Sequence, residues 1–442
     1  MESITSARGY GRAHRPIARF AAIGVAAAVA VALMPAAAIA STSGPAVYVP
    51  IAPVRLLDTR VGNGLSAKLS ANVPATFQVT GRGGIPADAT AVTGNLTVVN
   101  STAGWAVYLG PDPIAYPSSS AINFSAGEIL DNGLTVALSA TGTLSATYMG
   151  PAGATTDLVF DVGGYYTPDW SSQSGSCVTG TGATCSAYFP LPPQRTVDSR
   201  TGLGVGGQPG RLAANTPIPF TTTVTGGYHL TAITGNFTVV NPTSPWAVYL
   251  GPDPIAHPSS STINFLAGEI LGNNVTVALN STDACSITYM GPAGATTDFV
   301  FDSTGFYADD LGAVGAMLYV PISPVRLLDT RAGNGLSANL SANVPATFQV
   351  TGRGGIPADA TAVTGNLTVV NSTYPWAVYL GPDPVPSPTS SNVNFTAGEI
   401  LNNGLSVELS SSGTLSATYM STGGNTTDLV FDVTGYFIDA ST

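Results

Sequence analysis

Apolar residues alternate with small, mostly polar residues along many short stretches of this chain. Residues 92–99, 134–138, 143–148 and 158–162 each show this alternation. A period of two with one apolar face is typical of half-buried strands in antiparallel sheets. Glu408 occupies an outer position of one such stretch, so we expect its side chain to point away from the core.

Turn residues separate these stretches, and no segment after residue 40 has a convincing helical period. Gly62–Gly64, Gly81–Gly84, Gly110–Pro113 and Asn132–Gly133 are turn signals. About seven to nine short strands in a unit of this size predict an all-β fold, an antiparallel β-sandwich of jelly-roll or immunoglobulin-like topology.

One strand-like stretch, Tyr48–Arg60, returns at residues 188–200 and again at 319–331. Each copy opens a unit that closes on an Asp-x-x-Gly-aromatic-aromatic stretch. We therefore expect three tandem β-sandwich modules, repeat 1 at 47–167, repeat 2 at 187–308 and repeat 3 at 318–440. Such a unit can bury its own core, so we expect the repeats to be strung like beads through linkers at 168–186 and 309–317.

Residues 1–40 have the pattern of a secretory signal peptide. Arginines precede an apolar stretch, Ala21–Met34, and Ala38-Ile39-Ala40 forms a cleavage site. An uncleaved membrane anchor is the alternative. The pattern predicts an extracellular or cell-surface protein that leaves the membrane after cleavage.

The chain is acidic. It has 14 basic and 25 acidic residues; residues 1–40 hold four Arg and Glu2, which leaves 10 against 24, a net charge of −14. Phosphate binding needs clustered Lys and Arg, so nucleic acid is excluded as a partner.

Three cysteines leave one without a partner. Cys177 and Cys185 flank a short Gly/Thr-rich loop, and we expect them to form a disulfide that staples the linker. Cys285 stands where repeats 1 and 3 have leucine, which favours a small buried apolar role.

Charged residues recur in the opening stretch of each repeat. Residues two apart on a strand share a face, so Asp58 and Arg60 should point the same way and Arg55 the opposite way. Structural Arg–carboxylate pairs are the favoured interpretation. A ligand or Ca²⁺ site is the alternative, although no Ca²⁺-binding loop motif is present. The predicted ion-pair residues are Arg55, Asp58, Arg60, Arg195, Asp198, Arg200, Arg326, Asp329 and Arg331.

Catalytic motifs are absent from the sequence. His229 and His257 are the histidines after residue 40, and both lie in repeat 2 alone, so no His-based triad or zinc site belongs to the repeat. We predict no catalytic residues, no metal and no cofactor. Paired carboxylates leave a glycosidase-type hydrolase as a distant alternative.

An aromatic stretch, Trp105–Asp112, also recurs in each repeat. Trp and Tyr fall on opposite faces, so one of them should face outward. An exposed ring beside Asp and Asn could stack on a sugar, whereas a core Trp is the structural alternative. The ligand-binding candidates are Trp105, Tyr108, Asp112, Asn123, Trp246, Tyr249, Asp253, Asn264, Trp376, Tyr379, Asp383 and Asn394.

Four motifs of this chain together resemble an uncharacterised β-sandwich repeat. They are Pro-Val-Arg-Leu-Leu-Asp-Thr-Arg, Thr-Gly-Asn-Leu-Thr-Val-Val-Asn100, Ile122-Asn-Phe124 and Asp161-Val-Gly-Gly-Tyr-Tyr166. That repeat occurs in secreted actinobacterial and chloroflexi-like proteins of the cell surface, often beside hydrolase domains. The resemblance covers all three repeats and implies a secreted accessory or surface domain. Repeat 2 departs from it, since Gln194 replaces valine and Gly226–His229 replaces the Gly-Arg-Gly-Gly turn.

These observations favour a secreted, non-enzymatic structural or adhesive protein of the cell surface. A multivalent protein that binds cell-wall polysaccharide is the alternative, and an accessory polysaccharide or peptidoglycan hydrolase is the third. The expected partners are a cell-wall or extracellular glycan or other surface proteins.

Overall fold

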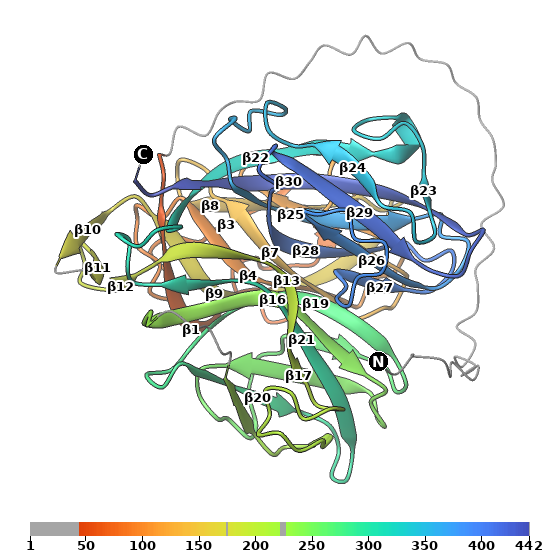
Figure 1. Ribbon diagram of the computed structural model, residues 1–442, viewed down its shortest axis with the longest axis horizontal. Helices are drawn as coiled ribbons and strands as arrows, with labels where there is room; N and C mark the ends of the chain where they lie inside the picture. The colour runs from red at the N-terminus through yellow and green to blue at the C-terminus, as the bar shows by residue number, and fades with distance from the viewer. Residues whose placement is uncertain (1–43, 174–175, 222–226, 442) are drawn as a thin grey trace. The chain divides into compact units, whose positions relative to one another are not determined.

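The alternating stretches fold as antiparallel strands in a computed structural model that describes residues 44–173, 176–221 and 227–441 (Figure 1). Apart from the 3-10 turn Thr330–Ala332, all regular structure in these ranges is β. The predicted all-β class with antiparallel sheets is confirmed. The predicted signal peptide lies outside the described residues.

Repeat 1 contributes two sheets. One has the strand order β1-β9-β4-β7, with β2 also paired to β9, and the other has the order β3-β8-β5-β6. The first and last long strands of the repeat are therefore neighbours. The bounds are β1 (Val47–Asp58), β2 (Leu69–Ser70), β3 (Ala75–Gln78), β4 (Ala91–Val99), β5 (Trp105–Gly110), β6 (Ile122–Phe124), β7 (Leu130–Ala137), β8 (Thr143–Tyr148) and β9 (Thr155–Thr167).

Repeats 2 and 3 reproduce these two strand orders. In repeat 2 the strands are β13 (Ala187–Asp198), β14 (Leu212–Ala213), β15 (Ile218–Thr221), β16 (Leu230–Val240), β17 (Trp246–Gly251), β18 (Ile263–Phe265), β19 (Ile270–Ala278), β20 (Ala284–Tyr289) and β21 (Thr296–Ala308). In repeat 3 they are β22 (Met317–Asp329), β23 (Leu340–Ser341), β24 (Ala346–Gln349), β25 (Ala362–Val370), β26 (Trp376–Gly381), β27 (Val393–Phe395), β28 (Leu401–Glu408), β29 (Thr414–Met420) and β30 (Thr426–Asp439).

The segment expected to be a linker, residues 168–186, contains a small sheet of its own. Its strands are β10 (Trp170–Gln173), β11 (Ser176–Thr179) and β12 (Thr184–Cys185). Cys177 and Cys185 face each other across β11 and β12 and form a disulfide with a Cα–Cα distance of 5.0 Å. Cys285 is free and buried.

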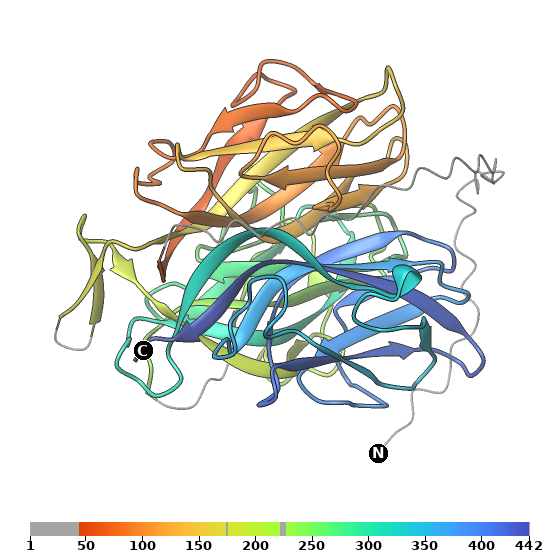
Figure 2. The ribbon, with the colours of Figure 1, turned by 90° about the horizontal axis from the view of Figure 1, so that it is seen from above.

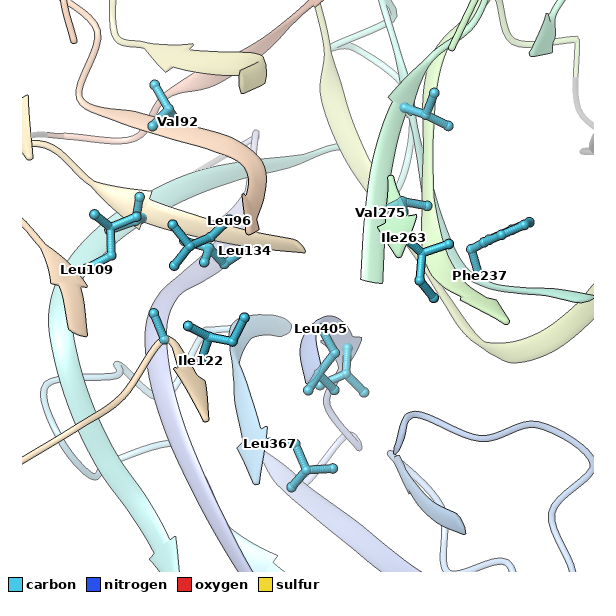
Figure 3. Packing of buried hydrophobic residues seen from close by; sticks show 14 of the residues in the cluster. Val92, Leu96, Leu109, Ile122, Leu134, Phe237, Ile263, Val275, Leu367 and Leu405 are labelled. Atoms are coloured by element: carbon cyan, nitrogen blue, oxygen red, sulfur yellow. The ribbon is translucent and has the colours of Figure 1, made fainter. Parts of the chain in front are cut away.

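Apolar side chains of the two sheets in each repeat pack together. In repeat 1, Val92, Leu96 and Leu134 of one sheet lie beside Leu109 and Ile122 of the other (Figure 3), and all are buried. Burying a side chain of this size contributes roughly 1.5–3 kcal/mol. The apolar face that the alternation predicts is thus the core-facing side of each sheet.

The polar face of the larger sheet is buried as well, which the sequence did not predict. Every residue of β7 is buried, including Asp131 and Asn132. The Asn132–Gly133 turn signal is wrong, because both residues lie inside this strand. The expectation of bead-like repeats is wrong too, because the described residues of all three repeats form one compact unit. Asparagines on these polar faces hydrogen-bond to other repeats.

The first strands of the three repeats meet edge to edge in a cycle. Tyr48 of β1 pairs with Ser186, Tyr188 of β13 pairs with Met317, and Tyr319 of β22 pairs with Ala46. Ala46, Ser186 and Met317 occupy the same position, two residues before the repeated tyrosine. Figure 2 separates the repeats by colour, repeat 1 in orange and yellow, repeat 2 in green and repeat 3 in cyan and blue.

A closed ring of six aromatic side chains joins these strand ends. Ring centroids are 5.2 Å apart within a repeat and 4.3 Å apart between repeats, and each side chain is at most 1% exposed. Aromatic pairs at such distances are worth about 0.5–1.5 kcal/mol each beyond the area they bury. The six are Tyr48, Tyr166, Tyr188, Tyr307, Tyr319 and Phe437.

Candidate functional site

A cycle of asparagines holds the polar faces of the repeats together. Asn132 of repeat 1 donates from Nδ2 to Oδ1 of Asn366 in repeat 3 at 3.0 Å, and its own Oδ1 accepts the backbone N–H of Gly404 at 2.7 Å. Asn273 makes the same pair of contacts with repeat 1, and Asn403 makes them with repeat 2. All three side chains are nearly fully buried. Buried amides must be hydrogen-bonded, and this cycle satisfies them.

At two of the three equivalent positions of this cycle the backbones approach too closely for a side chain, whereas repeat 2 has Asn274 at the third. A Cβ added to Gly133 would lie 1.7 Å from the carbonyl oxygen of Asn274, and one added to Gly404 would lie 1.9 Å from that of Gly133. The glycines after Asn132 and Asn403 therefore serve the contact between repeats and not a turn.

A buried carboxylate completes the interface between repeats 1 and 2. Asp131 accepts hydrogen bonds from the hydroxyl of Thr97 and from the backbone and side chain of Asn264. Burial raises the pKa of Asp131 to about 6. Repeat 3 has Asn402 at this position, which accepts from Asn123, and repeat 2 has Gly272.

The asparagine candidates for ligand binding are therefore interface residues in two repeats. Asn123 binds Asn402, and Asn264 binds Asp131. Asn394 instead pairs with Ser391 of its own repeat. Each asparagine lies on the strand beside that of the tryptophan, opposite the alanine that follows the tryptophan, and its side chain is already hydrogen-bonded within the protein.

The repeated tryptophans face outward. Trp105 is 69% exposed, Trp246 61% and Trp376 45%. The residues that follow them in the strand, such as Ala106 and Val107, are buried. The alternative of a core Trp is therefore wrong, since the ring sits at the very start of the strand, before the core begins.

The tyrosines of the same strands point inward. Tyr108, Tyr249 and Tyr379 are buried, and burial raises the pKa of Tyr108 to about 12. The tryptophan begins each strand, whereas the exposed Asp112, Asp253 and Asp383 come two residues after its end, and a strand of this length spans about 17 Å. The aspartates lie near the buried tyrosines, whose pKa their charges help to raise, but the tryptophans are at the other end of the strand. Among these aromatic candidates, only the tryptophans are exposed.

The opening stretch forms ion pairs in every repeat. Arg60 holds Asp58 through two hydrogen bonds of 2.8 and 2.7 Å, and Arg55 holds Asp161 through bonds of 2.9 and 2.8 Å. Repeats 2 and 3 repeat both pairs, Arg200–Asp198 with Arg195–Asp302 and Arg331–Asp329 with Arg326–Asp432. The Arg60 hydrogen bonds lower the pKa of Asp58.

The expectation that Arg55 points away from Asp58 is wrong. The pairing of β1 with β9 shifts register between Arg55 and Leu57, and this irregularity brings the Arg55 guanidinium within 3.6 Å of the Asp58 carboxylate. A bulge adds one residue to the period of two and so reverses the face. Arg55 and Arg60 together neutralise Asp58, which is buried.

A pocket of about 520 Å³ lies between repeats 2 and 3. Phe189, Tyr228 and Phe306 form its aromatic wall, and Gln194, Thr196, Ser303 and Glu408 are its polar side chains. Glu408 does not simply point to solvent as we expected, because its Oε2 is buried without a hydrogen-bond partner. The sequence held a signal that we missed: all four polar residues replace apolar ones of the other repeats.

No group of three or more His, Cys, Asp and Glu side chains that could hold a metal ion occurs among the described residues. Within those same ranges, no helix is long and apolar enough to cross a membrane. No family model and no curated protein matches the chain.

Proposed function

We propose that this is a secreted, non-enzymatic adhesive protein of the cell surface, whose three repeats each present one exposed tryptophan. The observation that carries the proposal is the exposure of Trp105, Trp246 and Trp376 at equivalent positions. A large aromatic ring held in water at three equivalent places favours a contact surface, since such rings supply most of the energy at binding interfaces.

The interfaces between the repeats support a rigid presentation. The aromatic ring and the asparagine cycle involve all three repeats, so the tryptophans are held by one packed body and not by flexible linkers. Sites fixed in this way engage a surface together at a low entropic cost, and avidity can exceed single-site affinity by about 10²–10⁴.

We infer that each repeat, at 47–167, 187–308 and 318–440, is a β-sandwich with jelly-roll topology, with the larger sheets of repeats 2 and 3 joined through β13 and β22. The inference rests on the two strand orders, in which the first strand neighbours the last and the long connections cross between the sheets.

A polysaccharide of the cell wall is the second candidate, as the specific target of this adhesion. The exposed indole rings favour it, because flat aromatic faces stack on sugar rings. Adhesion to another surface protein would use the same rings.

Retention of the secreted protein on peptidoglycan, chitin, cellulose and starch tests both candidates. The triple variant with Trp105, Trp246 and Trp376 changed to Ala should lose retention but keep its β circular-dichroism signal, because these side chains are exposed. The single variant Trp105→Ala should lose only part of it. Retention of the triple variant at the original level would overturn the proposal, and retention on no glycan but on whole cells would favour a protein target.

A further inference from the structure

Each repeat exposes an isoleucine in a loop next to its tryptophan. Ile129, Ile270 and Ile400 lie at the start of β7, β19 and β28 and are 52–54% exposed. The loop before each isoleucine is bonded to the segment before the tryptophan, since in repeat 1 the backbone N–H of Gly127 donates to the Ser101 carbonyl at 2.9 Å. Repeats 2 and 3 make the equivalent bond at 2.8 Å. Every repeat therefore presents an indole ring and an aliphatic side chain from two adjoining loops.

The tryptophan and the isoleucine lie at the end of the strands that is opposite the ring of six aromatic side chains. In repeat 1, β4 begins beside Tyr166 of that ring and ends at Val99. The connection from Val99 to Trp105 is hydrogen-bonded to the first residue of β9, which lies at this same end. Because β7 runs antiparallel to β4, Ile129 at the start of β7 lies there as well. In Figures 1 and 2 the C-terminus, which follows Phe437 of the aromatic ring, lies at the left.

Other exposed apolar side chains lie at the same end of the strands. Val73 and Val344 follow β2 and β23, which pair with the first residues of β9 and β30. Leu266 lies in the isoleucine loop of repeat 2, and Tyr374 precedes Trp376 in repeat 3. In Figure 1, β23 lies at the right, away from the C-terminus. Exposed apolar side chains that gather on one side of a protein indicate an interaction surface.

The three repeats present these side chains at one level. The asparagine contacts run from repeat 1 to repeat 3, from repeat 3 to repeat 2 and from repeat 2 to repeat 1. A closed cycle of three equivalent contacts relates the repeats by an approximate threefold rotation. Equivalent residues then lie at the same height along the rotation axis. The three tryptophan–isoleucine pairs therefore form three points of one plane, which fits a flat surface and not a narrow groove.

We propose that this end of the protein docks on a lipid surface without net charge. The proposal rests on the adhesive function proposed above and names the target of the exposed tryptophans. Indole rings favour the boundary between lipid headgroups and acyl chains, and aliphatic side chains gain by burial in the acyl layer. A sugar ring can stack on a tryptophan, but it offers the isoleucines no comparable apolar burial.

The charges at this end favour a neutral lipid over an anionic lipid or a second copy of the chain. Glu128, Glu269 and Glu399 lie in the isoleucine loops, which contain no Lys or Arg. Arg60 and Lys68, at the same end of repeat 1, are paired with aspartates of their own repeat. An anionic lipid would meet no cluster of basic residues in these loops, so it gains no electrostatic attraction from them. Two copies docked end to end would bring their glutamates together, and like charges at an interface are costly.

Flotation of the secreted protein, residues 41–442, with phosphatidylcholine vesicles tests the lipid surface. We expect the protein to float with these vesicles, and vesicles that also contain phosphatidylglycerol should bind no more of it. Bromine atoms on the acyl chains should quench the tryptophan fluorescence, because the indole rings reach the acyl boundary. Absence of flotation would overturn the proposal, and so would binding that requires phosphatidylglycerol.

A triple variant, Ile129→Ser with Ile270→Ser and Ile400→Ser, tests the lipid contact while it keeps the tryptophans. Its affinity for phosphatidylcholine vesicles should fall at least about tenfold, because three aliphatic side chains no longer enter the lipid. The matched control is Ile114→Ser with Ile255→Ser, since these isoleucines are also exposed but follow the other end of β5 and β17. The control should bind vesicles as the unaltered protein does. Equal vesicle affinity of the triple variant and the unaltered protein sinks the lipid assignment.

Two further results separate the lipid target from the adhesive function. Retention of the unaltered protein on whole cells or on a glycan, without flotation, would overturn the lipid target and leave the adhesive function in place. Sedimentation velocity without vesicles should show a monomer. A dimer that the triple isoleucine variant abolishes would show that a second copy occupies this end, and it would overturn the lipid target as well.

Discussion

The boundary between repeats 1 and 2 and the boundary between repeats 2 and 3 use the same elements but close differently. At the first, a cavity of about 60 Å³ remains between Ile51 of β1 and Ala278 of β19. At the second, the equivalent residues Leu191 and Glu408 line a pocket of about 520 Å³. The same strands therefore form a packed boundary at one place and a boundary with a pocket at the other, and the two differ in the side chains that line them.

Polar contacts differ between the two boundaries as well. At the boundary between repeats 1 and 2, Asp131 provides a hydrogen-bonded carboxylate. At the boundary between repeats 2 and 3, the equivalent residue is Gly272, which has no side chain. The hydroxyls of Tyr166 and Tyr307 pair across the first at 2.7 Å, whereas Tyr188 meets Phe437 across the second. Substitutions at the boundary between repeats 1 and 2 should therefore reduce the stability of the protein more.

The largest expected effect is a steric break at the first boundary. Gly133→Ala places a methyl group against the Asn274 carbonyl, and we expect a loss of about 3 kcal/mol or more in the free energy of unfolding. Denaturant unfolding measures it. Gly423→Ala is the control, since nothing lies within 4 Å of its added Cβ. Equal losses in the two variants would contradict the close approach of β7 to repeat 2.

The second largest effect is expected when a carboxylate like that of Glu408 is placed at the equivalent position of the packed boundary between repeats 1 and 2. Ala278→Glu puts a charge beside a small cavity with no basic residue provided for it, and it should cost about 2–4 kcal/mol. Glu408→Ala should be neutral or stabilising in the same unfolding assay. If both variants destabilise equally, the two boundaries do not differ as described.

The third prediction concerns pH. Burial raises the pKa of Asp131 to about 6, above its ordinary value of 3.8, so the folded state binds this proton more tightly than the unfolded state. Its contribution to stability is complete below about pH 4 and is lost as the pH rises through about 6. Asp131→Asn, the residue type of repeat 3, should therefore stabilise the protein at pH 7 by about 1–2 kcal/mol and flatten this part of the pH profile. Thermal unfolding between pH 4 and pH 7 measures both, and an unchanged slope would show that another group titrates.

The smallest effect is expected from removing the hydroxyl groups of Tyr166 and Tyr307, which pair within the cycle of six aromatic side chains. Tyr166→Phe leaves the buried Tyr307 hydroxyl without its partner and should cost about 1–2 kcal/mol. The double variant Tyr166→Phe with Tyr307→Phe should recover most of that loss, because both polar groups are then gone and Phe437 already fills the ring in repeat 3. A double variant that is less stable than the single one by the same amount again would mean that the hydroxyls act separately.

The sequence determined the local structure of this protein. Alternation predicted antiparallel strands, the recurring motif predicted three equivalent units, and the paired charges Asp58 and Arg60 were placed on one face, where they meet. Cys177 and Cys185 were expected to pair and are bonded. These are short-range properties, and a period of two with turn residues between the strands is sufficient to specify them.

Only the tertiary structure decided what covers the polar face of each sheet. Thr, Asn and Asp at these positions suit water or a hydrogen-bonding partner equally well, so the alternation could not distinguish an exposed face from a buried one. The sequence pattern therefore predicts a turn at Asn132, whereas this residue lies in β7 and binds repeat 3. For the same reason the pattern predicts an outer position for Glu408, whose Oε2 is buried, and the bulge at Arg55 reverses the face that regular strand geometry assigns. Each of these outcomes depends on contacts between residues more than 100 positions apart or on one irregular pairing, and a local pattern contains neither.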